Sequence, residues 1–217
     1  MRGVNSESGA AGRAGGLLPA GAESTLRYAV ESHHPRLVTA CSFQKEESVL
    51  IDMLMAIEPN ARVFTIDTGV LFPETYETWR RIEDRYGLKI EVIDALPPNG
   101  TPWSAASCCG VRKVEALNRA LEGTAAWITG IRREQSPTRA EAENVEWDAA
   151  RGVWKFNPLA GWSDKDVWTY VHDRDLPYHP LHDRGYASIG CAPCTTPGDG
   201  REGRWAGQAK TECGLHV

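Results

Sequence analysis

The chain has 217 residues and a formal net charge of −5 at pH 7. This acidic balance argues against a nucleic-acid-binding role, which needs a basic face, and no apolar run approaches the ~20 residues that a membrane span requires. The Gly- and Ala-rich stretch 1–21 lacks the apolar segment of a secretion signal, so it predicts a disordered leader on a cytoplasmic protein.

Short β-branched runs alternate with helical patterns from residue 22 onward. Between the first two runs, apolar residues recur at helical spacing over 49–57, and Pro73 is well placed to open the next helix. This alternation predicts a doubly wound α/β fold with a mostly parallel sheet, whose ligands bind at the carboxyl ends of the strands. Buried parallel strands are predicted at 36–43, 61–67, 89–95 and 125–130.

Two later helices are predicted from their capping residues. Ser107 is the predicted N-cap of an apolar stripe, which would place Cys108 and Cys109 in the first turn of that helix. The sequence "SDKD" at 163–166 has the form of a capping box. From Thr195 the chain becomes Gly-rich and polar. We therefore expect a domain over 22–194 followed by a mobile C-terminal arm over 195–217.

Four of the six cysteines form two close pairs: Cys108 with Cys109, and Cys191 with Cys194 in C-x-x-C spacing. In a reducing compartment, such pairs bind metal or act in catalysis more often than they form disulfides. Four thiolates suit zinc or an iron–sulfur cluster. Adjacent thiolates reach two irons of a cluster more easily than two vertices of one zinc tetrahedron. The spacing favours a cluster, and zinc, a redox dithiol and buried thiols remain open alternatives.

The other two cysteines have different surroundings. Cys41 lies inside an apolar strand, where core packing explains it. Cys213 lies near the end in "TECGLHV", where it is either an inert exposed thiol or a nucleophile carried on the arm. A nearby His216 or a basic pocket would raise its thiolate fraction. The residues alone favour neither interpretation of Cys213.

Several loops offer contacts to an anion. "CSFQKEES" (41–48) follows the first strand and precedes a helix, although it lacks the glycines of a P-loop. "IDTG" (66–69) and "TGIRREQSPTR" (129–139) follow the second and fourth strands, and the latter carries Arg132, Arg133 and Arg139. "REGR" (201–204) places two arginines in the arm. Their convergence at strand ends would form a site for a small anionic ligand.

Taken together, these segments resemble the assimilatory adenylyl-sulfate (APS) reductases, the iron–sulfur branch of the PAPS/APS reductase family. The resemblance covers about residues 25–217 and rests on "CCGVRKVEAL", "TGIRREQSPTR", "LPYHPLHDRGYASIGCAPCT", "REGR" and "ECGLH". It implies an adenine-nucleotide α-hydrolase-like fold. It also implies reduction of adenosine 5′-phosphosulfate to sulfite and AMP in sulfate assimilation.

The resemblance assigns roles to individual positions. It implies that Cys108, Cys109, Cys191 and Cys194 hold a [4Fe–4S] cluster, that Lys113 lies between cluster and substrate, and that Cys213 is the nucleophile. Nucleotide-contacting positions are implied at Ser42, Phe43, Ile66, Thr68, Gly130 and Arg139. Arg201, Arg204 and His216 match residues around the phosphosulfate.

The implied reaction forms a thiosulfonate on Cys213, which a dithiol protein such as thioredoxin resolves. The cluster cysteines favour APS over its 3′-phosphorylated form, PAPS, without excluding use of both, and a homo-oligomer is left open. One rival is an ATP pyrophosphatase or small ATP-sulfurylase subunit, whose S-G-G-x-D-S loop is missing from "SFQKEES". Another is a non-catalytic iron–sulfur or zinc module, which would keep its function after Cys213→Ser.

Overall fold

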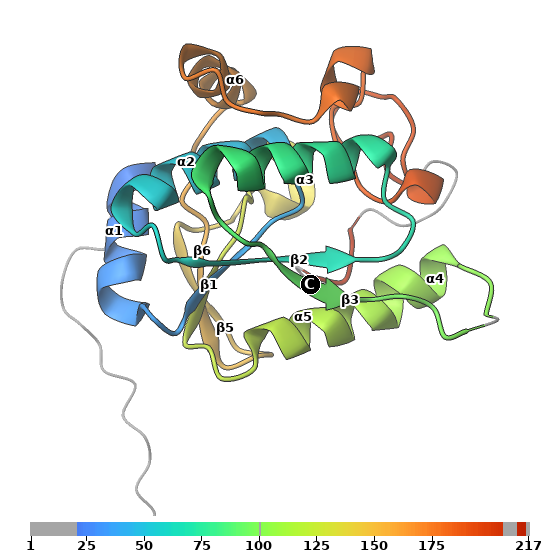
Figure 1. Ribbon diagram of the computed structural model, residues 1–217, viewed down its shortest axis with the longest axis horizontal. Helices are drawn as coiled ribbons and strands as arrows, with labels where there is room; N and C mark the ends of the chain where they lie inside the picture. The colour runs from blue at the N-terminus through green and yellow to red at the C-terminus, as the bar shows by residue number, and fades with distance from the viewer. Residues whose placement is uncertain (1–20, 100, 206–211, 216–217) are drawn as a thin grey trace, which may run out of the picture.

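A computed structural model describes residues 21–99, 101–205 and 212–215. Its centre is a six-stranded sheet in the order β3-β2-β1-β4-β6-β5 (Figure 1). All neighbours pair in parallel except β5, which lies antiparallel to β6 at the edge. The strands are β1 (Leu37–Ala40), β2 (Arg62–Asp67), β3 (Glu91–Asp94), β4 (Ala126–Ile128), β5 (Val145–Asp148) and β6 (Val153–Phe156).

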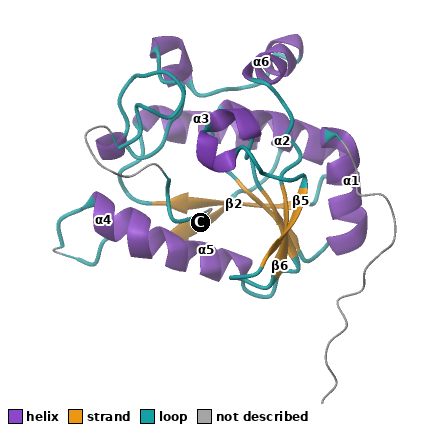
Figure 2. Ribbon diagram, turned by 180° about the vertical axis from the view of Figure 1, so that it is seen from behind, coloured by secondary structure: helices purple, strands orange, loops and turns teal. Residues whose placement is uncertain are grey.

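Helices cover both faces of this sheet, which confirms the doubly wound α/β prediction (Figures 1 and 2). On one face lie α1 (Ala22–His33), α2 (Lys45–Ile57), α3 (Pro73–Tyr86) and α6 (Asp164–Asp173); on the other lie α4 (Ala105–Ser107) and α5 (Lys113–Leu121). Leu117 of α5 packs with Phe64 and Trp127 of the sheet, whereas Ile51 and Ile82 pack against its opposite face. No helix in the described ranges combines the length and apolar character needed to cross a membrane.

The four predicted strands are present with slightly shorter bounds, but β5 and β6 were not predicted. Each strand of this hairpin has four residues. It exposes Trp147 and Trp154, which are 53% and 38% accessible and meet edge to face with their ring centroids 5.2 Å apart. Charged and apolar residues alternate in β5, and Lys155 interrupts the apolar residues of β6. An edge hairpin with one wet face therefore lacks the continuous apolar run that marks a buried parallel strand.

The prediction that Ser107 caps the helix carrying the adjacent cysteines is wrong. Ser104 is the N-cap, with an extended backbone, and its Oγ accepts a hydrogen bond from the Ser107 N–H at 3.2 Å. Ser107 is already helical, and Cys108–Arg112 forms a π-helical turn between α4 and α5. Such wide turns are rare and concentrate at functional sites. The predicted starts at Pro73 and Ser163 are confirmed.

The order of the strands decides where a ligand can bind. β1 lies beside β4. After β1 the chain continues to β2 on one side of this pair, whereas after β4 it continues to β5 and β6 on the other side. The sheet therefore has a topological switch point between these two strands, where the loops after them diverge and leave a crevice. The loops that begin at Cys41 and Thr129 border this crevice.

Candidate active site

A cavity of about 400 Å³ opens at the carboxyl ends of β1, β2 and β4. Nine of the predicted site residues line it: Ser42, Phe43, Ile66, Lys113, Gly130, Arg139, Arg201, Arg204 and Cys213. Thr68 lies behind the wall, fully buried, with Oγ1 3.2 Å from the sulfur of Cys191. His216 lies outside the described residues. Segments far apart in sequence thus converge on one pocket.

The loop after β1 forms one wall of this cavity. Phe43 has a positive φ of 62° and is buried, with its ring stacked on Trp79 at 5.3 Å between centroids. The Glu47 carboxylate accepts hydrogen bonds from the Ser42 hydroxyl at 2.9 Å and the Gln44 N–H at 3.2 Å. Glu47 therefore closes a capping box with Gln44 at the N-terminus of α2.

Burial, together with the charge of Glu46, raises the pKa of Glu47 to about 8, even though the Ser42 hydroxyl and backbone N–H groups favour its ionised form. The Glu47 carboxyl group also lies against Gly130, so close that a Cβ added to Gly130 would overlap it. Gly130 is therefore needed for close approach between the loops after β1 and β4. Gly130 lines the cavity, and its contact with a nucleotide stays a prediction.

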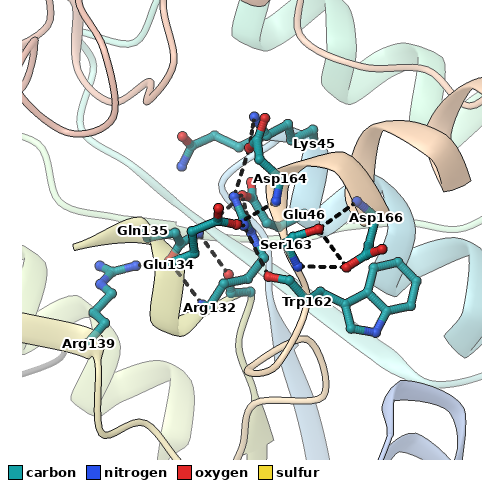
Figure 3. Close-up of polar contacts among 12 residues, drawn as sticks. Lys45, Glu46, Arg132, Glu134, Gln135, Arg139, Trp162, Ser163, Asp164 and Asp166 are labelled. Atoms are coloured by element: carbon teal, nitrogen blue, oxygen red, sulfur yellow. Dashed lines mark hydrogen bonds and ion pairs between the residues drawn. The ribbon is translucent and has the colours of Figure 1, made fainter. Parts of the chain in front are cut away.

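The loop after β4 forms a second wall of the cavity, and ion pairs join it to α2 and α6 (Figure 3). Arg132 is buried and pairs with Glu46 and Asp164 at 2.9 Å each, and with Glu134 at 3.2 Å. Lys45 pairs with Asp164 at 2.6 Å. The Arg132 guanidinium thus binds three carboxylates of the protein itself. It does not contribute to the small-anion site that was predicted from the sequence.

The neighbouring arginines of this loop differ in their partners. Arg133 donates to the Ala142 carbonyl at 2.7 Å and is not among the residues that line the cavity. Arg139 does face the cavity and donates to the side-chain oxygen of Gln135. The Gln135 amide in turn donates to Glu46 at 3.1 Å and to the Gly130 carbonyl at 3.2 Å. Gln135 therefore links the Arg132 network to Arg139.

Positive charge gathers at the end of the cavity near the arm. Arg204 donates to the Ile189 carbonyl at 3.1 Å and stacks on Trp205 at 4.6 Å. The buried Nε atoms of Arg201 and Arg204 have no hydrogen-bond partner within the described part of the chain. Buried donors are nearly always satisfied. These two atoms therefore fit a ligand anion.

Lys113 reaches the same end of the cavity from the start of α5. Burial lowers its pKa, but the neighbouring sulfurs of Cys213 and Cys191 outweigh burial, so the pKa is raised overall. Lys113 is therefore a partly buried cation between the predicted nucleophile and one of the predicted cluster cysteines.

The four paired cysteines come together although about 80 residues separate the two pairs. All four are buried free thiols. Cys108 shares hydrogen bonds with Cys109 and Cys191, and Cys109 and Cys194 pack in one group with Trp205. A set of buried sulfur donors from two segments is the kind that ligates iron–sulfur clusters. The donor chemistry of these residues fits such a group.

A single metal ion makes a different demand on the ligands. Zinc needs its sulfurs about 2.3 Å from one common point. In the described ranges, no set of three or more His, Cys, Asp or Glu side chains is arranged to hold a metal ion. The thiolates of a four-iron cluster each bind a different iron, so they do not converge on one point.

Cys213 is 7% exposed and packs against Cys109 and Trp205. The interpretation of Cys213 as an exposed tail thiol is therefore wrong. Gly214 allows this packing, because a Cβ there would lie 3.0 Å from the Cys109 carbonyl oxygen. The hydrogen bond with Cys109 and burial raise the pKa of Cys213, whereas Lys113 lowers it.

Three polar residues at or behind the cavity wall were not predicted from the sequence: Glu47 and Gln135, which line the cavity, and Glu212, which binds two of the lining arginines. The Glu212 carboxylate binds both Arg139 and Arg201. Its only signal in the sequence is its position next to Cys213. The role of Gln135 depends on Glu46, 89 residues away. Glu47 has local partners in Ser42 and Gln44, but its burial against Gly130 depends on the fold.

Comparison with known proteins is consistent with this site. The family model described as the phosphoadenosine phosphosulfate reductase domain matches residues 36–197. A Gloeobacter violaceus protein named phosphoadenosine 5′-phosphosulfate reductase is 46% identical, covering 90% of this chain and 88% of its own. A Geobacillus kaustophilus protein named adenosine 5′-phosphosulfate reductase is 44% identical, covering 91% and 90%.

A solved structure shares the fold. The phosphate complex of phosphoadenylyl-sulfate reductase from Candida auris superposes with a TM-score of 0.68 at 27% identity, over 82% of this chain and 91% of that one. The fold implied by the sequence resemblance is thereby confirmed.

Proposed function

The chain belongs to the phosphoadenosine phosphosulfate reductase family, and from this we propose that it reduces adenosine 5′-phosphosulfate to sulfite and AMP. One observation carries the proposal: Cys213, Lys113, Arg201 and Arg204 line one end of a single cavity. A nucleophile beside a group of cations suits attack on an anionic sulfur. The proposal thus rests on the site as well as on the family.

The rest of the cavity suits the nucleotide part of the substrate. Its volume of about 400 Å³ lies in the range of small-molecule sites. Ile66 provides apolar surface beside the switch point, and the cations lie near the arm. We infer that adenosine binds between the loops after β1, β2 and β4, with the phosphosulfate directed toward the arginines.

The proposed first step is attack of the Cys213 thiolate on the sulfur of APS. A sulfur–sulfur bond forms, the bond from sulfur to the bridging oxygen breaks, and AMP leaves with the electron pair. The product is a thiosulfonate on Cys213. Lys113, Arg201 and Arg204 would offset the repulsion between the thiolate and the sulfonate oxygens and stabilise charge in the transition state.

The proposed second step uses a dithiol protein such as thioredoxin. One of its thiolates attacks the Cys213 sulfur and expels sulfite, and its second thiol then reduces the mixed disulfide. The dithiol is oxidised to a disulfide and Cys213 returns to the thiol. Because Cys213 is 7% exposed, its sulfur must become more accessible before a protein can attack it.

Cys108, Cys109, Cys191 and Cys194 are the residues that would hold a [4Fe–4S] cluster. When bound, such a cluster would contribute a charged group beside Lys113 that tunes the local field. The thiols themselves keep the segment at 191–194 against the π-helical turn. Iron and sulfide analysis of anaerobically purified protein tests this assignment, and Cys109→Ser should lower iron content whereas Cys41→Ser should not.

Sulfite release tests the function directly. Anaerobic protein is mixed with reduced thioredoxin and either APS or PAPS, in parallel because relatives carry both names. We expect sulfite from APS, its loss in Cys213→Ser with iron retained, and no loss in the matched Cys41→Ser control. Sulfite from PAPS alone would reassign the substrate, and sulfite from neither in iron-loaded protein would refute the reductase proposal.

A further inference from the structure

The carboxylate next to the proposed nucleophile is held by an unusually complete set of donors. Arg139 binds Glu212 through two parallel hydrogen bonds, with Nε to Oε1 and Nη2 to Oε2 both at 2.9 Å. Arg201 Nη2 adds a third at 2.8 Å. The hydroxyls of Thr138 and Ser136 complete the shell at 3.1 and 3.3 Å.

This shell is far stronger than a surface ion pair. The side chains of Glu212, Arg139 and Arg201 are only 11 to 13% exposed. Burial raises the pKa of Glu212, but Arg139 and Arg201 outweigh burial, so the pKa is lowered overall. Paired guanidinium and carboxylate groups in such surroundings form strong, directional contacts. Glu212 is therefore fixed in position, and Cys213 is the next residue in the chain.

Some arginine N–H donors near Glu212 do not bind its carboxylate. Arg139 has both edges engaged, by Glu212 and by Gln135. Arg201 keeps its Nε and Arg204 its own Nε without a partner in the described ranges. The cations of the site thus divide into Arg139, which binds the protein's own carboxylate, and a pair that retains donors for a ligand anion.

We propose that Glu212 is the positioning residue for Cys213: its carboxylate, seated on Arg139 and Arg201, holds the Cys213 sulfur at the cavity. Arg139 then acts through Glu212, and the substrate anion binds Arg201 Nε, Arg204 Nε and Lys113. The inference deepens the proposed function and rests on it for the identity of the substrate.

Two rates of the same thiol test this role. Full-length wild type and Glu212→Gln are compared by mass spectrometry for alkylation of Cys213 by iodoacetamide and, separately, for single-turnover S-sulfonation of Cys213 by APS. Glu212→Gln should make Cys213 more mobile. Its alkylation should then become about tenfold faster, and its S-sulfonation about 10- to 100-fold slower. Glu202→Gln, an exposed carboxylate on the same arm, should change neither rate.

The alkylation of Cys41 in the same samples separates positioning from general loosening. Cys41 packs in a different cluster, with Ile51, Trp79 and Ile82, and borders the cavity from the β1 side, so its rate should stay at the wild-type value. An equal rise at Cys41 and Cys213 would overturn the proposal, as would unchanged alkylation of Cys213.

A double variant tests whether Arg139 works through Glu212. Arg139→Gln with Glu212→Gln should be no slower in S-sulfonation than the slower single variant, because both changes break one contact. Additive losses, or a higher KM for APS in Arg139→Gln alone, would show that Arg139 binds substrate independently and would overturn that part. If wild type fails to react with APS, the proposed function falls, while the alkylation ratio still decides whether Glu212 seats Cys213.

Discussion

Arg132 and Glu46 form a buried ion pair in the cavity wall, with Arg132 Nη2 2.9 Å from Glu46 Oε1 and side chains only 4% and 5% exposed. Arg132 comes from the loop after β4, and Glu46 from the first turn of α2. Asp164, at the start of α6, binds the same guanidinium (Figure 3). The pair therefore joins three elements around the proposed nucleotide site.

Removing the cation of this pair should be costly. Arg132→Met leaves Glu46 buried without its partner, and we expect a loss of about 3–5 kcal/mol in the free energy of unfolding. Urea denaturation at neutral pH measures it. Arg133→Met, at the partly exposed neighbour, should cost less than about 0.5 kcal/mol. Similar losses for both variants would contradict the role of the pair.

The raised pKa of Glu47 predicts a pH-dependent stability. The folded protein binds this proton more tightly than the unfolded chain, so the stabilisation is complete below the ordinary carboxyl pKa and is lost as the pH rises through about 8. Glu47→Gln mimics the protonated form at every pH. Its stability relative to wild type should therefore increase from pH 5 to pH 8, by up to about 4 kcal/mol.

Denaturation of both proteins at matched ionic strength measures that difference. Taking the difference cancels the titration of groups that the two proteins share. A difference that stays constant between pH 5 and pH 8 would show that Glu47 is already ionised in the folded protein at acid pH.

Lys113 should affect catalysis much more than fold. Lys113→Met keeps the length of the partly buried side chain but removes the charge facing Cys213, and kcat/KM for APS should fall about 10²- to 10³-fold. Lys165→Met, on the surface of α6, is the control and should leave kcat/KM unchanged. Equal activity of Lys113→Met and wild type, measured by sulfite release, would remove this cation from the proposed mechanism.

Gly190 should be intolerant of a side chain. A Cβ at this position would overlap the Arg204 guanidinium, which lies against the glycine. Gly190→Ala should displace Arg204 and lower kcat/KM for APS about 10- to 100-fold, with a smaller effect on thermal unfolding. At Gly161 an added Cβ meets only Arg133 at 3.6 Å, an ordinary contact. Gly161→Ala should therefore keep the activity, and a comparable loss there would contradict the explanation.

Much of the site follows from local sequence. The loops after β1 and β4 were expected to meet because parallel strands present their carboxyl ends at one edge, and Ser42, Phe43 and Gly130 do line one cavity. The cysteine pairs were expected to act together, and they lie together. The prediction was wrong where two nearby residues have the same capping ability: Ser104, and not Ser107, is the N-cap of the helix.

The sequence by itself determined the parallel strands, the helix starts at Pro73 and Ser163, and the inventory of cysteines and arginines. These features depend on periodicity and side-chain chemistry within a few residues. Only the tertiary structure decided which cation serves which partner. Arg132, Arg139 and Arg204 look alike in the sequence, yet one binds the buried carboxylate of Glu46, one binds Glu212, and one has a buried Nε with no partner in the described part of the chain. Charges interact through space over a few ångströms, so their roles are set by neighbours that the fold brings from distant segments.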